Sequence, residues 1–156
     1  MGFVEAVKTV LSNYLVFSGR ATRPEYWYFV LFYAMCNFAC SILDRLLGTH
    51  FPTGGSSGLI STGLSIAMTI PYLAVGVRRL HDTEHSGWWI GGITLALFIA
   101  AMALVYSRPL GAILFVGVGV VVLLQLTWLC SAGTPGPNPY GPPPPTAANI
   151  APSAPE

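Results

Sequence analysis

Residues 110–129 read LGAILFVGVGVVVLLQLTWL, twenty residues without a charged side chain. At a rise of about 1.5 Å per residue, a helix of this length extends about 30 Å, which is the thickness of the hydrocarbon core of a bilayer. A helix buried in a soluble bundle keeps one polar face, and this stretch has none. The segment therefore predicts a membrane-spanning helix.

Three further stretches are long, apolar and free of Lys, Arg, Asp and Glu: residues 26–43, 58–77 and 88–107. With residues 110–129 they predict an all-α integral membrane bundle of four transmembrane helices within residues 26–130. Pro71 lies inside the second stretch, where it would kink the helix and free the carbonyl of Ala67.

The composition agrees with a membrane protein. The 156 residues include seven Lys or Arg and six Asp or Glu, so 8% are charged, against about 25% in soluble domains. Hydrophobic residues make up 53%, the mean hydropathy is +0.63 and the net charge is +1. These values disfavour a cytosolic enzyme, a disordered protein and a nucleic-acid-binding protein.

Residues 1–25 predict an amphipathic helix followed by a turn. Apolar residues recur there at helical spacing: Phe3, Val7, Val10, Tyr14 and Phe17. Such a helix either lies in the membrane interface or packs on the end of the bundle. Thr22 and Glu25 then fit a capping box that begins the first span, with Pro24 in its first turn.

The basic residues predict the orientation. Five of them precede the first span or lie between the second and third: Lys8, Arg20, Arg23, Arg78 and Arg79. The loops on the other side carry only Arg45 and Arg108. This asymmetry places both the N-terminus and the C-terminus in the cytoplasm.

Residues 131–156 form a Pro-rich tail with nine of the thirteen prolines and one charge, Glu156. The composition predicts a disordered cytoplasmic tail, and the alternative is a Pro-rich docking peptide.

Polar and aromatic residues that flank the spans define a candidate interaction or ion-pair cluster on the cytoplasmic face: Arg20, Arg23, Glu25, Trp27, Arg78, Arg79, His81, Asp82 and Trp88. If the second span continues as a helix, Arg78 and Asp82 form an i, i+4 pair on one of its faces. The cluster then either locks the bundle by ion pairs or holds a phosphate or lipid headgroup. The tryptophans are equally typical of an interfacial aromatic belt.

His81, Glu84 and His85 match the H-x-x-E-H pattern of some zinc hydrolases. On a helix, the two histidines would share a face and could bind zinc, with Glu84 as the general base. A third ligand is not evident, and the segment sits in a loop with Ser86 and Gly87, so no metal or other cofactor is expected.

Three motifs resemble domain-of-unknown-function family 805, small bacterial inner-membrane proteins. FSGRATRPEYW at residues 17–27 is similar to the family's F-x-G-R-x-x-R-x-E-[YF]-W. RRLHD at residues 78–82, followed by SGWW at residues 86–89, resembles a second motif, and GPNPYGP at residues 136–142 resembles the closing segment. The resemblance implies a multi-pass protein of the bacterial cytoplasmic membrane and carries no activity with it.

The first functional hypothesis is a non-enzymatic module that binds a protein partner or anionic lipid headgroups at its cytoplasmic face. The alternatives are a small oligomeric transporter or channel subunit and, last, the zinc hydrolase. Expected partners are the lipid bilayer and either another protein or a second copy of the chain, and no nucleic acid.

Overall fold

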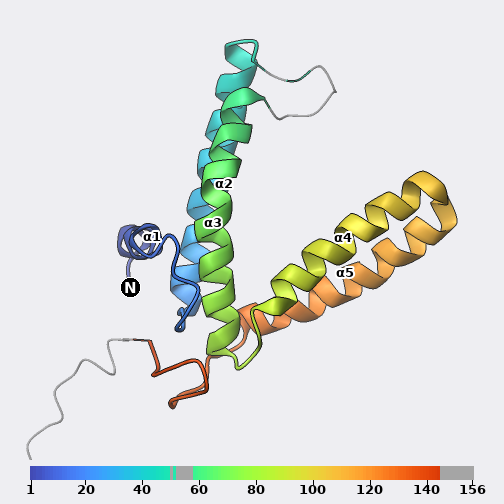
Figure 1. Ribbon diagram of the computed structural model, residues 1–156. Helices are drawn as coiled ribbons and strands as arrows, with labels where there is room; N and C mark the ends of the chain where they lie inside the picture. The colour runs from blue at the N-terminus through green and yellow to red at the C-terminus, as the bar shows by residue number, and fades with distance from the viewer. Residues whose placement is uncertain (50, 52–57, 145–156) are drawn as a thin grey trace, which may run out of the picture. The chain divides into compact units, whose positions relative to one another are not determined.

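The computed structural model describes residues 1–49, 51 and 58–144, and the regular elements in this part of the chain are helices (Figure 1). They are α1 (Phe3–Ser12), α2 (Arg23–Leu46), α3 (Leu59–Asp82), α4 (Trp88–Tyr106) and α5 (Arg108–Cys130). Helices α2 to α5 are long and apolar enough to cross a membrane. The predictions of an all-α chain and of four helices with the length and composition of membrane spans are therefore confirmed for the described residues.

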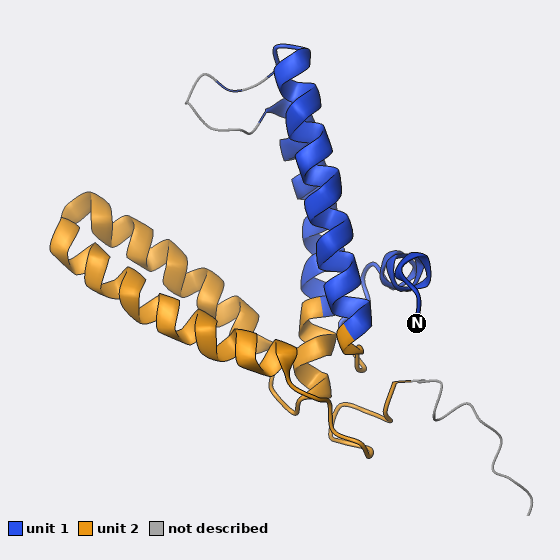
Figure 2. Cartoon of the chain, turned by 180° about the vertical axis from the view of Figure 1, so that it is seen from behind, with its two compact units in different colours: residues 1–17, 24–75, 145–156 blue, residues 18–23, 76–144 orange. Residues whose placement is uncertain are grey.

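The described residues divide into two units, which Figure 2 colours separately. Unit 1 holds residues 1–17 and 24–75, and unit 2 holds residues 18–23 and 76–144. Most of α3 belongs to unit 1, whereas its last turns belong to unit 2. Each unit is described below by itself.

The helices extend beyond the predicted spans. Helix α2 begins at Arg23, which puts Thr22 at the N-cap position, and α3 continues past residue 77 to Asp82. A hydropathy pattern reveals only the apolar part of a helix. The helix can continue through charged residues that lie outside the hydrocarbon core, and these residues do not appear in the pattern. Arg78 to Asp82 are therefore helical rather than part of a loop.

In unit 1, α1 buries one face, formed by Ala6, Val7 and Val10. The ring of Phe3 contacts that of Tyr28 on α2 edge to face, with 5.8 Å between centroids. The helix ends early, because the side chains of Ser12 and Asn13 donate hydrogen bonds to the carbonyl of Thr9. Its contacts are those of a helix packed on a span, and its depth in a membrane stays a prediction.

Pro71 lies inside α3 and is fully buried. A proline cannot donate a hydrogen bond to the carbonyl four residues earlier, which here is that of Ala67. The hydroxyl of Tyr14 donates to this carbonyl instead. The segment that follows α1 thus satisfies the backbone group that the proline leaves free.

Tyr14→Phe is expected to destabilise the protein by about 1–2 kcal/mol, because the Ala67 carbonyl loses its hydrogen bond in a setting that excludes water. The measurement is the free energy of unfolding by SDS titration in mixed micelles. Tyr28→Phe is the matched control, since that hydroxyl has no hydrogen-bond partner among the described residues. Equal losses in the two variants would contradict the assigned bond.

Asp44, near the end of α2, is fully buried in unit 1. Its carboxylate accepts hydrogen bonds from Thr49 Oγ1 at 2.6 Å and from the backbone N–H groups of Ile60 and Ser61, each at 2.9 Å. The first N–H groups of a helix have no partner within it. Asp44 therefore caps the N-terminus of α3 from a neighbouring helix.

Unit 2 contains the hairpin of α4 and α5, which are joined by Ser107 alone. The backbone N–H of Ser107 donates to Ala103, and the N–H of Gly111 donates to the Ser107 carbonyl. A Cβ added at Gly111 would lie 2.6 Å from the Cα of Leu104. The close approach of the two helices therefore requires glycine at residue 111.

The expectation of a disordered tail from residue 131 onward is wrong for its first part. Residues 131–144 have defined positions in unit 2, because their backbone groups hydrogen-bond to α3 and to Arg20. Composition does not reveal this, since the partners lie far away in the sequence. Residues 145–156 lie outside the described part of the chain.

Candidate functional site

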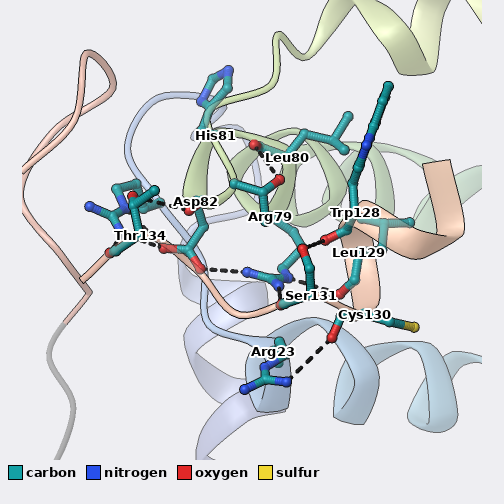
Figure 3. A network of polar contacts seen from close by, with 12 residues as sticks. Arg23, Arg79, Leu80, His81, Asp82, Trp128, Leu129, Cys130, Ser131 and Thr134 are labelled. Atoms are coloured by element: carbon teal, nitrogen blue, oxygen red, sulfur yellow. Dashed lines mark hydrogen bonds and ion pairs between the residues drawn. The ribbon is translucent and has the colours of Figure 1, made fainter. Parts of the chain in front are cut away.

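Three buried charged side chains meet in unit 2. We call this arrangement the clasp: Arg20, Arg79 and Asp82, together with residues 129–136, whose carbonyls the two arginines bind. The side chains of Arg20, Arg79 and Asp82 are 1%, 0% and 6% exposed. Figure 3 shows Arg79 and Asp82 at its centre, with Leu129, Ser131 and Thr134 around them.

Arg20 joins α3 to the C-terminal segment. Its Nε donates to Asp82 Oδ1 at 2.9 Å, and its two terminal nitrogens donate to the carbonyls of Gly136, at 2.7 Å, and Thr134. All three nitrogens of the guanidinium are therefore used within the protein.

Arg79 makes the equivalent set of bonds to the end of α5. Its Nε donates to the carbonyl of Leu129 at 3.1 Å, and its terminal nitrogens donate to Asp82 Oδ2 and to the carbonyl of Ser131. Arg23 adds a bond from Nη1 to the carbonyl of Cys130 at 3.3 Å. The last carbonyls of α5, which have no partner inside the helix, are satisfied in this way.

The charges in the clasp balance. The C-termini of α3 and α5 both end here, and each carries the equivalent of about half a negative charge. With the Asp82 carboxylate, they offset the two positive charges of Arg20 and Arg79. The two arginines thus provide the positive charge that compensates the negative ends of two helices at the same place.

The end of α3 binds the C-terminal segment through neutral groups as well. Thr134 N–H donates to the carbonyl of Asp82 at 3.0 Å, and Asn138 Nδ2 donates to that of His81 at 2.9 Å. The ring of His81 stacks on that of Tyr140 with 4.0 Å between centroids, while its Nδ1 lies 3.2 Å from the Gly19 carbonyl.

Along residues 134–139, inward and outward positions alternate. Thr134, Gly136 and Asn138 make the inward hydrogen bonds given above, whereas Pro135, Pro137 and Pro139 are exposed. We call these three the proline ridge. Asn138 and Gly141 then exchange backbone hydrogen bonds of 3.1 and 3.0 Å, which close a turn.

The structure places five of the predicted cluster residues at or next to the clasp: Arg20, Arg23, Arg79, His81 and Asp82. The two carboxylate oxygens of Asp82 bind Arg20 and Arg79, rather than the Arg78 that the i, i+4 spacing predicts. Arg78 is buried, and its carbonyl accepts the backbone N–H of Ala21 at 3.0 Å. Trp88 is 85% exposed and takes no part, while Glu25 and Trp27 belong to unit 1.

The premise of the zinc hypothesis is wrong. Helix α3 ends at Asp82, Glu84 has a φ of 61°, and the N–H of His85 donates to the carbonyl of Leu80. This is a Schellman-type helix end, so His81 and His85 do not share a helical face. His85 stacks on Trp128, and among the described residues no group of three His, Cys, Asp or Glu could hold a metal ion.

Apart from Asp82, the acceptors of the clasp could not be predicted from the sequence, because they are backbone carbonyls. Sequence reasoning also missed the inward role of Thr134, Asn138 and Tyr140, although the GPNPYGP segment stands out as a motif. Within this motif, Asn138 and Tyr140 contact His81 at the end of α3, and Asn138 and Gly141 close the turn.

Comparison with known proteins gives a consistent result. A family model described as "Protein of unknown function (DUF805)" matches residues 14–142. The chain is 37% identical over 135 residues to inner membrane protein YhaH of Escherichia coli K12, covering 86% of this chain and 92% of that protein. It is 35% identical over 133 residues to inner membrane protein YhaI of the same strain, covering 85% and 89% respectively. No solved structure matches the chain.

Proposed function

The chain belongs to the DUF805 family, and we propose that it is a non-enzymatic module of the bacterial inner membrane that binds a protein partner through its proline ridge. The relatives are named as inner membrane proteins, and four helices are able to span a bilayer. The excess of Lys and Arg around Arg20 and Arg79 supports a cytoplasmic position for the clasp and for both termini.

One observation carries the proposal: the alternation along residues 134–139. The buried charged side chains of the clasp hold this segment in place. As a result, the proline rings at residues 135, 137 and 139 are exposed. Proline loses little conformational entropy on binding, and aromatic-lined grooves recognise such preformed, Pro-rich segments.

An anionic lipid headgroup fits the arginines less well. The guanidinium groups of Arg20 and Arg79 already donate from all three nitrogens to protein acceptors. A phosphate would have to break these bonds in order to bind. Arg23 is exposed, and among the described residues it makes one hydrogen bond, to the carbonyl of Cys130, so a headgroup could reach it.

The test begins with a photoreactive residue in place of Ala132, which is exposed beside the ridge, in the full chain in native membranes. We expect it to cross-link one protein. The affinity of that purified protein should fall at least tenfold when Pro135, Pro137 and Pro139 are all replaced by alanine. Replacing Pro152 and Pro155 by alanine is the control and should leave the affinity unchanged.

Equal affinity of the ridge variant would contradict the proposal. A second pair of results would also contradict it. In this case the photoreactive residue cross-links no protein, and native mass spectrometry shows anionic lipids that stay bound to the chain but are lost from the Arg23→Ala variant. That second result would assign the face to lipid instead.

A further inference from the structure

Unit 1 carries a groove of about 560 Å³ along α2 and α3. Its lining combines polar side chains with aromatic rings: Tyr33, Asn37, Phe38, Ser41, Ser65 and Tyr72. The groove lies on helices of spanning length, so its polar groups face a region that water does not reach.

Hydrogen bonding within the groove is complete at Ser65. Its Oγ accepts bonds from Asn37 Nδ2 at 2.8 Å and from the Tyr33 hydroxyl at 3.2 Å, and it donates to the carbonyl of Ser61 at 2.8 Å. The amide of Asn37 is only half used. Among the described residues, its Oδ1 and its second N–H have no hydrogen-bond partner.

The position of Asn37 makes this costly. Helix α2 has 24 residues and is about 36 Å long, and Asn37 lies within about 4 Å of its midpoint. A span of this length places that point deep in the hydrocarbon. An amide oxygen and an N–H exposed to lipid tails there would each forgo a hydrogen bond.

We propose that the groove is the contact surface for a second copy of this chain, in which the two Asn37 amides pair across a two-fold axis. An amide is self-complementary, because it offers one donor and one acceptor side by side. Two-fold symmetry brings the same residue of each copy face to face, so both free N–H groups and both Oδ1 atoms are satisfied at once. Phe38, which is 68% exposed, supplies apolar contact beside the pair.

This inference does not rest on the proposed partner at the proline ridge, because that ridge belongs to unit 2. Interhelical hydrogen bonds of polar side chains are a known source of association between membrane helices, each of modest strength. Two hydrogen bonds between the Asn37 side-chain amides therefore predict a dimer that forms reversibly.

The first experiment uses disulfide cross-linking of the full chain in membranes. Cys36, Cys40 and Cys130 are replaced by alanine, and a single cysteine is placed at Ser41, which lies about 40° around α2 from Asn37. We expect copper phenanthroline to produce a covalent dimer. Ala39→Cys is the matched control, since it is exposed at similar depth but about 160° away, and it should not cross-link.

The second experiment measures the dissociation constant of the dimer by lipid dilution, using energy transfer between copies labelled at Cys130, with Cys36 and Cys40 replaced by alanine. Asn37→Leu should raise the dissociation constant about tenfold, which corresponds to the loss of two interhelical hydrogen bonds between polar side chains. Ser65→Ala removes the intrachain bond but leaves Asn37 in place, so it should keep the dimer within about twofold.

Three results would overturn the proposal: no dimer from Ser41→Cys, equal cross-linking from Ala39→Cys, or an unchanged dissociation constant in Asn37→Leu.

Discussion

Asp82→Asn is expected to lower the free energy of unfolding by about 3–5 kcal/mol, the cost of leaving a buried charge without its partner. Asp82 provides the only carboxylate for Arg20 and Arg79 within the described residues, and all three side chains are buried. Neutralising it leaves two adjacent guanidinium groups whose positive charges repel each other. Residues 131–138 should then lose their attachment to α3.

The loss can be measured by SDS titration in mixed micelles and by protease cleavage after residue 130. Cleavage in the C-terminal segment should become faster in Asp82→Asn. Glu84→Gln is the control, because it makes the same charge change two residues away at an exposed position. If Asp82→Asn and Glu84→Gln had the same stability and the same cleavage rate, the clasp would contribute little to stability and the prediction would be wrong.

Asp44→Ala is expected to have the second-largest effect, a fall of about 5–10 °C in Tm. The substitution removes the acceptor of three hydrogen bonds and leaves the N–H groups of Ile60 and Ser61 unsatisfied at the start of α3. Asp44→Asn keeps one carbonyl oxygen and should lose about half as much.

Arg45→Ala provides the comparison for Asp44, since Arg45 is the next residue and is exposed. It should change the Tm by less than about 2 °C. Amide hydrogen exchange gives an independent readout, because only loss of the cap should speed exchange at Ile60 and Ser61. Unchanged exchange there in Asp44→Ala would refute the capping role.

The spans could be predicted because a helix that crosses lipid must be apolar on all sides, and such a pattern is visible in residues 110–129 without any tertiary information. The start of α2 and the end of α3 could not be located in this way. Their terminal residues, Arg23 and Asp82, are charged, and whether the end of α3 stays helical depends on partners such as Arg20, which lies 62 residues from Asp82.

Three members of the predicted cluster, Arg20, Arg79 and Asp82, meet in the structure, but their connections could not be predicted. Arg20, Arg79 and Asp82 stand out as charges in a chain with few of them, yet the i, i+4 rule considers only α3 and assigns Asp82 to Arg78. Backbone carbonyls supply most of the remaining acceptors, and they leave no trace in a sequence. Asp44 was missed for the same reason, because two of its three partners are backbone N–H groups.

The clasp also fixes an order of events during synthesis. Arg20 and Arg79 emerge from the ribosome well before residues 129–136, which carry the carbonyls that these arginines bind. Until then the arginines can bind Asp82, but the other four of their six hydrogen bonds in the clasp must be made to water. The clasp can therefore close only after α5 and the residues that follow it have been synthesised.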